Sequence, residues 1–312
     1  MAEQDTHASH FGGHPIPTGK VTERVSRWNL AGLGKASTNN TSNSAVSEQD
    51  RFGSNSSIIP PWNPQVNATA IGLLQRLTAW SLRLFYRITS RAIYRGEDDA
   101  RYASLPKTRS FWNKTLLSTF LPEALVQSVI ALPFAMSLAA PEVLIGNQPL
   151  PGNPGWQVAN AAGVFLFTVG FALEAGADWQ LENHKNERTV GLLRDGVWSI
   201  VRHPNYLGDA LIHASFPLIL YGAGIFHPLM LLAPLANYAF LRYVGGDGQN
   251  EKSQEERYEE RDLKKAKDLK SYKMEKNSFW PRVEEWKNEW AWIVVGTGVV
   301  GVLGEWCVRR FL

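Results

Sequence analysis

The sequence predicts an all-α protein, a polytopic membrane helical bundle that follows a disordered N-terminal leader. One observation behind this prediction is a set of five apolar stretches, each near the ~20 residues with which a helix crosses a hydrocarbon layer of ~30 Å. The other is the polar start of the chain, where Ser, Asn, Thr and Gly dominate residues 37–57. Such a segment buries too little apolar surface to offset the entropy of ordering. We therefore expect a leader over 1–60 and a membrane domain over 71–312.

The apolar stretches are the predicted membrane spans, because lipid offers the backbone no hydrogen-bond partner and favours helices that satisfy themselves. They are residues 116–140, 156–177, 207–223, 225–244 and 290–308. The third and fourth are short and are joined by YGAGIFHP, whose glycines and proline suit a tight hairpin. For these two stretches, a pair of helices buried inside a soluble protein is the alternative.

Residues 71–94 precede the first span and combine charge with apolar character. Four arginines share one helical face at spacings of seven, four and four: Arg76, Arg83, Arg87 and Arg91. Leucines and a tryptophan form an apolar stripe: Leu73, Leu77, Trp80 and Leu84. The pattern favours an amphipathic helix in or near the lipid headgroups over a ligand site.

The distribution of basic residues predicts the orientation in the membrane. Residues 76–114 carry nine lysines and arginines, whereas the loop 141–155 carries none. Because short basic flanks tend to remain in the cytosol, residues 178–206 and 245–288 are expected on the cytosolic face. We expect the endoplasmic reticulum as the organelle from the family resemblance given below, and not from composition.

Composition excludes several classes of function. With 32 basic and 29 acidic residues the net charge is only +3, too small for a protein that binds nucleic acid by neutralising many phosphates. Cys307 is the one cysteine, so an intrachain disulfide and a cysteine-based zinc site are excluded. We predict no metal site, because His7, His10 and His14 are scattered in the polar leader. The start of the chain lacks the apolar core of a cleaved signal peptide.

Three carboxylates recur every four residues at the end of the second span: Glu174, Asp178 and Glu182. On a continuing helix they form a column of like charges that needs basic neighbours, a cationic ligand or water. The basic candidates near them in sequence are Lys185, Arg188, Arg194 and Arg202. A solvated helix end is the alternative.

The densest chemical signal runs from Glu174 to His213, and its second half is the stretch RDGVWSIVRHPNYLGDALIH, residues 194–213. Turns are expected at Asp195-Gly196 and at Pro204-Asn205, with Asn205 as the cap of a helix that resumes at Tyr206. Arg202 and His203 precede that helix and are suited to phosphate or carboxylate groups.

Asp209 and His213 lie four residues apart inside the following apolar stretch. Ionisable residues at that depth more often line a cavity than face lipid, so both are site candidates. A hydrogen bond between the two side chains is the alternative.

The run GLLRDGVWSIVRHPNYLGDAL resembles the cofactor-binding region of the steroid 5α-reductase superfamily, especially its uncharacterised membrane proteins with a reductase-like C-terminal domain. Further pieces agree in order: RLFYRITSRAIYRGEDDARY at 83–102, ADWQ at 177–180, a charged stretch with Arg257 and Tyr258, and SYKMEKNSFWP at 271–281. In the last piece Tyr272 lies nine residues before Pro281, similar to the family's C-terminal pattern. The resemblance covers about residues 75–288.

The resemblance implies a helical bundle that holds NADPH on its cytosolic side. It also implies hydride transfer to a carbon-carbon double bond conjugated to a ketone, in a steroid or other lipid substrate within the bilayer. The cofactor contacts that it implies are Asp178, Arg202, His203, Asn205, Tyr206, Asp209, Arg257 and Tyr272. It assigns no catalytic residue here, and no GxGxxG follows a strand, so a Rossmann domain is not expected.

The chain departs from the reductase pattern at several positions. Several membrane helices usually precede the arginine-rich segment, whereas residues 1–60 stand there in this chain. Leu181 and Glu182 replace expected basic residues, and Asp209 replaces the usual glutamate. Cofactor binding is thus expected more strongly than turnover, and a non-catalytic membrane protein, or one completed by a protein partner, is one alternative.

A second alternative is a membrane methyltransferase that uses S-adenosylmethionine, because isoprenylcysteine carboxyl methyltransferases resemble the same RHPNY-like turn, helical hairpin and trailing tyrosine. GEDDARY and ADWQ fit the reductase-like branch better.

Overall fold

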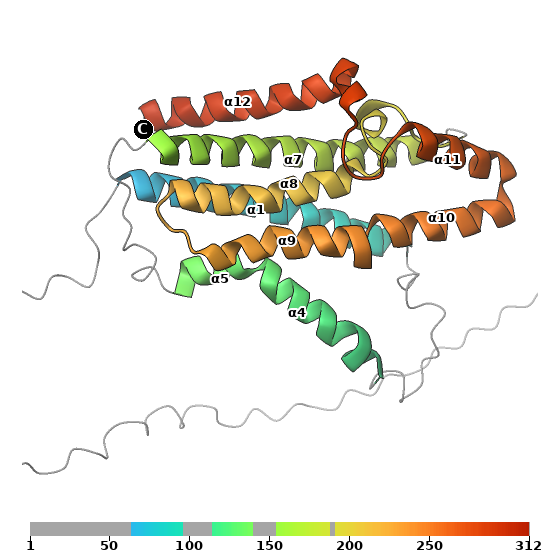
Figure 1. Cartoon of the computed structure of the whole chain (residues 1–312), viewed down its shortest axis with the longest axis horizontal. Helices are drawn as coiled ribbons and strands as arrows, with labels where there is room; N and C mark the ends of the chain where they lie inside the picture. The colour runs from blue at the N-terminus through green and yellow to red at the C-terminus, as the bar shows by residue number, and fades with distance from the viewer. Residues whose placement is uncertain (1–63, 96–113, 140–153, 188–190, 312) are drawn as a thin grey trace, which may run out of the picture. The chain divides into compact units, whose positions relative to one another are not determined.

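Figure 1 presents the computed structural model, which describes residues 64–95, 114–139, 154–187 and 191–311. These residues all belong to one unit of the chain, 60–312, which is separate from 1–59. Within the described ranges the regular structure is helical throughout and contains no strand, as the sequence predicts. The predicted leader, its histidines and the GEDDARY segment lie outside the described residues.

The helices follow one another with short 3-10 or π-helical segments, labelled η, between them. In chain order the described elements are α1 (Pro64–Arg95), η2 (Leu116–Phe120), α4 (Leu121–Ile130), α5 (Leu132–Ala139), α7 (Pro154–Asn186), η4 (Gly196–Ser199), α8 (Pro204–Gly222), η5 (Pro228–Leu231), α9 (Leu232–Ala239), η6 (Phe240–Val244), α10 (Asp247–Arg261), α11 (Leu263–Glu275), η7 (Val283–Lys287) and α12 (Glu289–Phe311).

The centre of the unit is an antiparallel pair formed by α7 and α8. Their backbones approach closely where Gly170 faces Gly208: a Cβ on Gly170 would lie 2.6 Å from the carbonyl oxygen of Gly208. A Cβ on Gly208 would lie 2.5 Å from the carbonyl oxygen of Gly170. Only a residue without a side chain permits such an approach. The crossing therefore fixes the register between the two helices that carry most of the predicted site residues.

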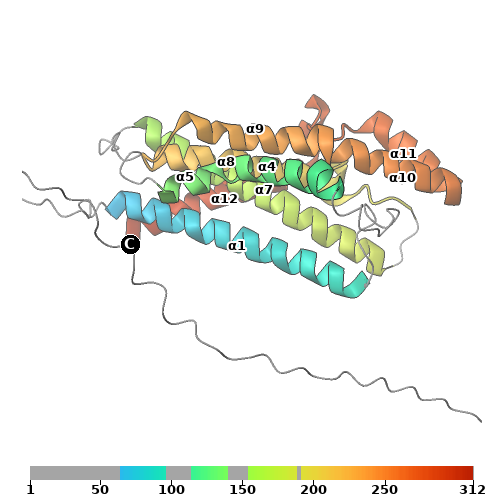
Figure 2. The ribbon, with the colours of Figure 1, turned by 90° about the horizontal axis from the view of Figure 1, so that it is seen from below.

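Two further helices pack along this pair. On α1, Leu73, Leu77 and Trp80 pack against the buried cluster of Phe167, Ile212 and Phe216. Helix α12 runs antiparallel to α7, because Gly298 lies against Phe165 and Val169 while Arg309, near its end, donates to Asn160 at 3.3 Å. Figures 1 and 2 both show α1, α7 and α8 side by side.

Two helices, α7 and α12, are long and apolar enough to cross a membrane by length and composition. The five-span prediction is thus supported for the second and fifth spans. The first predicted span is divided among η2, α4 and α5, and the fourth begins at Pro228 and is divided among η5, α9 and η6. The third span is α8, whose Ile212, Phe216 and Ile219 are fully buried. Helix α8 therefore fits the alternative of a helix buried among its neighbours.

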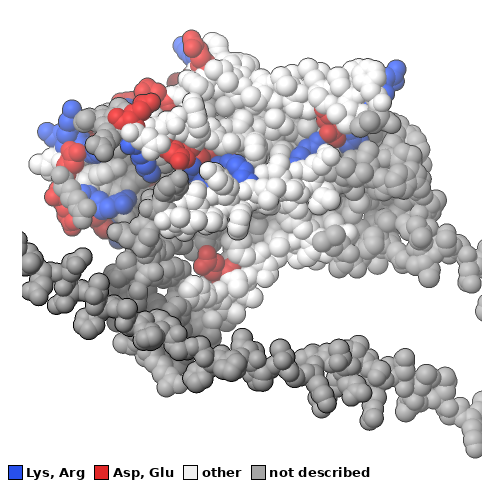
Figure 3. All heavy atoms as spheres, turned by 180° about the vertical axis from the view of Figure 1, so that it is seen from behind, with Lys and Arg blue, Asp and Glu red and all other residues white. Residues whose placement is uncertain are grey.

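Polar and apolar surfaces separate along the unit. Charged side chains gather at one end, where α10 and α11 lie, while most of the remaining described face in Figure 3 is uncharged. On α12, Trp292, Val300, Leu303 and Trp306 are all exposed. A broad apolar surface next to a charged end is typical of proteins that sit partly in a bilayer.

Candidate functional site

The ADWQ segment supports the turn that begins the predicted motif. Gly196 has a φ of +68°, and a Cβ there would lie 2.3 Å from the side-chain amide of Gln180. Gln180 Oε1 accepts a hydrogen bond from the Val197 amide at 3.0 Å, and Trp198 Nε1 donates to the Ala177 carbonyl at 3.2 Å. The turn predicted at Asp195-Gly196 is confirmed, and it is built directly on the end of α7.

The RHPNY turn pairs with the loop after α11. The amide of Arg202 donates to the Asn277 carbonyl and that of His203 to the Ser278 carbonyl, both at 3.0 Å. The Tyr272 hydroxyl donates to the carbonyls of Trp198 and Val201. Burial raises the pKa of this hydroxyl above its usual value. Two segments that lie about seventy residues apart in the sequence, both singled out by the resemblance, are thus joined by hydrogen bonds.

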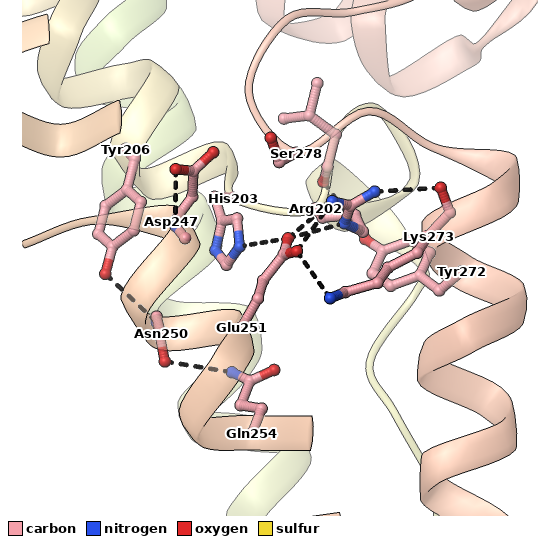
Figure 4. A network of polar contacts seen from close by, with 12 residues as sticks. Arg202, His203, Tyr206, Asp247, Asn250, Glu251, Gln254, Tyr272, Lys273 and Ser278 are labelled. Atoms are coloured by element: carbon pink, nitrogen blue, oxygen red, sulfur yellow. Dashed lines mark hydrogen bonds and ion pairs between the residues drawn. The ribbon is translucent and has the colours of Figure 1, made fainter. Parts of the chain in front are cut away.

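Glu251, on α10, is the hub of the polar end (Figure 4). Its carboxylate accepts from Arg202 Nε at 2.9 Å and Nη2 at 3.0 Å, and from His203 Nε2 at 3.0 Å. Lys273 Nζ lies 3.1 Å from the same carboxylate. We call Glu251, Arg202, His203 and Lys273 the Glu251 cluster.

The cluster is largely shielded from solvent, since 12% of the Glu251 side chain and 11% of the Arg202 side chain are exposed. Burial by itself raises the pKa of Glu251, but hydrogen bonds from His203 and Arg202 outweigh it and lower the pKa to about 2. Burial lowers the pKa of Lys273, and its contacts with Glu255 and Glu251 outweigh burial and raise it. The network therefore holds a carboxylate anion among fixed donors.

The carboxylate column on α7 meets the arginines of α1. Arg83 forms ion pairs with Glu174, at 2.6 Å, and with Asp178. Arg87 forms ion pairs with Asp178, at 2.8 Å, and with Glu182, at 3.4 Å. We call these five side chains the α1–α7 ladder.

The ladder corrects two sequence-based expectations. Three of the four arginines on that face of α1, namely Arg76, Arg83 and Arg87, form ion pairs with carboxylates of the chain, and the partner of Arg76 is Glu305 of α12. The basic neighbours of the column therefore come from α1. Arg202, one of the expected candidates, pairs with Glu251 instead. The physical reason is that three carboxylates spaced by four residues match arginines spaced by four on an adjacent helix.

Polar side chains from four helices, α1, α7, α8 and α9, lie around Glu174, which also belongs to the ladder. Trp80 Nε1 donates to Glu174 Oε2 at 2.9 Å, and the Trp80 ring meets the edge of the His213 ring at 5.5 Å. Asp209 accepts from Asn237 Nδ2 at 3.1 Å, and its other oxygen lies 3.7 Å from His213 Nε2. We call Trp80, Glu174, Asp209, His213 and Asn237 the inner polar site. Asp209 and His213 therefore lie close together within a larger group, but at 3.7 Å they do not form the direct hydrogen bond that was the alternative for this pair.

Four buried polar side-chain atoms have no hydrogen-bond partner among the described residues. Two are Nη1 of Arg76 and Nη1 of Arg83, whose guanidinium groups form ion pairs with Glu305 and Glu174. The other two are Nδ1 of His213, a buried side chain of the inner polar site, and Oδ1 of Asn205. A buried polar atom without a partner costs about 1–3 kcal/mol, so each such atom calls for an explanation. A ligand that supplies the missing partner is one explanation with chemical content.

The structure brings four of the eight predicted cofactor residues into these three groups. Asp178 lies in the ladder, Asp209 in the inner polar site, and Arg202 and His203 in the Glu251 cluster. The Tyr206 ring stacks on His203 with centroids 5.2 Å apart, and its hydroxyl accepts from Asn250 at 3.3 Å.

Two predicted residues have different surroundings from those expected. Arg257 is exposed on α10 and donates to the Ser253 carbonyl of its own helix at 3.0 Å, away from the three groups. Asn205 is not a helix cap: α8 begins at Pro204 with His203 as its N-cap, because proline suits the first helical position.

Several residues of these groups were missed from the sequence. Trp80, Lys273 and Asn237 lie in helical patterns where nothing separates them from their neighbours. Glu251 lies in a charge-rich stretch, and no spacing distinguishes it from the other glutamates there. Arg83 carried a usable signal, because its spacing to Arg87 repeats that of Glu174 and Asp178.

The residues present fit part of the cofactor that the resemblance implies. The orphaned Oδ1 of Asn205 suits a ligand hydroxyl or amide donor. Phosphate groups need cations, and Arg83, Arg87 and Arg202 are all paired with carboxylates of the chain. One acceptor for a ligand is thus present, whereas a phosphate would need one of these carboxylates to move away from its arginine.

The family model of DUF1295, described as a protein of unknown function, matches residues 62–273. No solved structure matches the chain. The matched region spans α1, α7 and α8 in full and ends within α11, so it contains the ladder, the inner polar site and the Glu251 cluster.

Proposed function

We propose, on the premise that this chain belongs to the DUF1295 family, that it is an integral membrane oxidoreductase. In this proposal it binds NADPH and reduces a carbon-carbon double bond conjugated to a ketone in a steroid or other lipid. The proposal rests on the ordered resemblance to steroid 5α-reductases. The two helices with the length and composition of membrane spans support a site next to lipid.

One observation carries the proposal: the inner polar site lies among apolar helices and includes a buried, unpartnered atom of His213. Buried polar groups normally have hydrogen-bond partners. A cluster of polar side chains with one unpartnered atom is therefore a candidate place for a ligand that completes the hydrogen bonding. Bound NADPH would supply the hydride. The chain's part is to exclude water and to offer hydrogen bonds at a ketone oxygen where negative charge develops.

The chain's residues divide these tasks by position. Asn205 and Asp209 lie one turn apart on α8, and in this proposal they contact the neutral groups of the cofactor. His213 lies one turn further into the apolar region, and in this proposal it contacts the substrate oxygen. Trp80 holds Glu174 by a 2.9 Å hydrogen bond and packs on the His213 ring, which keeps both side chains in place.

A second candidate function is an S-adenosylmethionine-dependent membrane methyltransferase, and Asp209 favours it. The described partners of Asp209 are neutral: the Asn237 amide and the His213 ring, with no lysine or arginine within ion-pair distance in the described ranges. A carboxylate so placed suits a sulfonium cation, and this cofactor brings no phosphate that needs a cation set. A fold that has lost both ligands is the third candidate.

Ligand-induced thermal stabilisation of the detergent-purified chain tests the proposal. A ligand at a hundred times its dissociation constant adds ~2.7 kcal/mol to the free energy of unfolding. We expect NADPH to raise the melting temperature of the wild type and to raise that of Asn205→Ala less. Arg310→Ala, exposed at the end of α12 and not among the predicted cofactor contacts, is the control and should respond like the wild type.

The outcomes separate the three candidates. Stabilisation by S-adenosylmethionine alone supports the methyltransferase, and stabilisation by neither cofactor supports the non-catalytic fold. With NADPH binding established, turnover of enone sterols and fatty enoyl lipids, followed by product mass, tests the reaction. NADPH binding without any such product would leave a binding protein and refute the oxidoreductase.

A further inference from the structure

The Glu251 cluster has the donors of an anion site, and the anion in it belongs to the chain itself. Arg202 contacts the carboxylate with two nitrogens, while His203 and Lys273 add one each. Two parallel donors from a guanidinium together with an ammonium are the usual means of binding carboxylate and phosphate.

Each of the three donors is held in place by contacts that do not involve Glu251. Arg202 Nη1 donates to the carbonyls of Lys273, at 3.2 Å, and of Lys276. The His203 ring stacks on Tyr206, and Lys273 Nζ contacts Glu255 at 2.5 Å. Arg202 and His203 are thus preorganised by the RHPNY turn and the end of α11, and Lys273 is held by α11 and by Glu255 of α10, so the three donors stay converged when the side chain of Glu251 leaves them.

Glu251, in contrast, comes from a helix attached mainly through polar groups. Helix α10 is rich in charged residues. Besides Glu251, its first two turns contact the rest of the unit by an ion pair between Asp247 and Arg242 and by a hydrogen bond from Asn250 to Tyr206. No residue of α10 belongs to the buried apolar clusters of the described part of the chain. Because no apolar side chain of α10 is buried in these clusters, displacement of Glu251 by a competing anion would replace polar contacts and would not open the apolar core.

We infer that Arg202, His203 and Lys273 form a binding cradle for a phosphate group, and that Glu251 fills this cradle as an internal anion which the phosphate displaces. A phosphate offers more acceptor oxygens and more negative charge than one carboxylate, so it competes for the same donors. The inference deepens the proposed function by naming where a phosphate binds, and rests on it only where NADPH is the phosphate's source. A lipid headgroup is the other source of the same chemistry.

The test compares two variants that remove the same charge from α10. Glu251→Gln removes the internal anion, whereas Glu255→Gln, the matched control one turn along, touches Lys273 but neither Arg202 nor His203. The detergent-purified full-length chain is titrated with sodium pyrophosphate, and the melting temperature reports binding. We expect the pyrophosphate dissociation constant to fall about tenfold or more in Glu251→Gln, which is about 1.4 kcal/mol, and to change less than about threefold in Glu255→Gln.

Glu251→Asp keeps the experiment decisive if Glu251→Gln does not fold. It retains the charge but draws the carboxylate back by one methylene, so pyrophosphate should bind with intermediate affinity. Pyrophosphate affinity that is unchanged or weaker in both variants overturns the inference.

Two parallel titrations identify the source of the phosphate and keep this inference separate from the proposed function. One uses NADPH and the other uses a short-chain phosphatidic acid in the same detergent. Tighter pyrophosphate binding without any NADPH binding supports the cradle and refutes the proposed cofactor, and the phosphatidic acid titration then tests the lipid headgroup. NADPH binding to the wild type with no gain for pyrophosphate in Glu251→Gln supports the cofactor and overturns the cradle.

Discussion

The hydroxyl of Tyr272 and the amide of Asn205 were both expected to contact a cofactor, and their surroundings now distinguish them. Tyr272 donates to two carbonyls of the turn before α8, whereas Asn205 Oδ1 has no partner among the described residues. We predict that Tyr272→Phe lowers the free energy of unfolding by about 1 kcal/mol and leaves ligand affinity unchanged. Asn205→Ala should show the reverse. Thermal melts with and without NADPH measure both quantities, and a Tyr272→Phe protein of normal stability with weakened NADPH binding would contradict this assignment.

Glu251 makes the stability of the polar end depend on acid. Its pKa in the folded protein, about 2, is below the ordinary 4.5, so its contribution is present in full above about pH 4.5 and is lost as the pH falls towards 2. After solvent screening we expect this contribution to be about 1–2 kcal/mol. The wild type should therefore lose stability over this pH window more steeply than Glu251→Gln. Melting temperatures of the two proteins from pH 6 to about pH 2.5 measure the difference, and parallel curves would refute it.

At the scale of elements, the α1–α7 ladder predicts unequal costs for removing its arginines. Arg83→Met leaves Glu174 without its described ion-pair partner, and breaking a buried pair in this way costs about 3 kcal/mol. Arg87→Met leaves Asp178 still paired with Arg83, and Glu182 is exposed, so its cost should be below about 1 kcal/mol. Chemical or thermal unfolding in detergent gives both values. Adding Glu174→Gln to Arg83→Met should recover part of the loss, and equal costs for the two single variants would exclude the ladder.

The glycine crossing between α7 and α8 makes a second prediction for elements. Gly170→Ala and Gly208→Ala each place a methyl group against backbone atoms of the other helix, and we expect each to cost about 2 kcal/mol or more. Gly304→Ala on α12 meets nothing within 4 Å and should change stability by less than about 1 kcal/mol. Because α8 carries Asn205, Asp209 and His213, the first two variants should also weaken ligand binding. Similar melting temperatures for all three variants would mean that the crossing is looser than described.

For the molecule as a whole, the helical class and the turn at Gly196 could be predicted because they depend on local pattern. The pairing of distant segments could not. Arg83 meets Glu174 from 91 residues away, and Glu251 meets Arg202 from 49 residues away, so tertiary packing alone chooses these partners. Composition also cannot separate a lipid-facing apolar helix from one covered by neighbours, and the burial of Ile212, Phe216 and Ile219 on α8 appears only in the packed structure.

The arrangement of the unit predicts which segments share a side of the membrane. The RHPNY turn and the loop after α11 are joined by backbone hydrogen bonds, so the end of α7 and the whole of α10 must lie on one side, which basic-residue counts predict to be the cytosol. Helix α12 begins near that side and ends beside the start of α7, so its last residues should lie on the opposite side.

Single cysteines at Glu187, Glu256 and Arg310, each placed in a Cys307→Ser background, test this in sealed vesicles of known orientation. An impermeant maleimide should label the first two from the cytosolic face and the third from the other face. Labelling of positions 187 and 256 from opposite faces would separate the segments that form the Glu251 cluster and would rule out both the proposed cofactor site and the phosphate cradle.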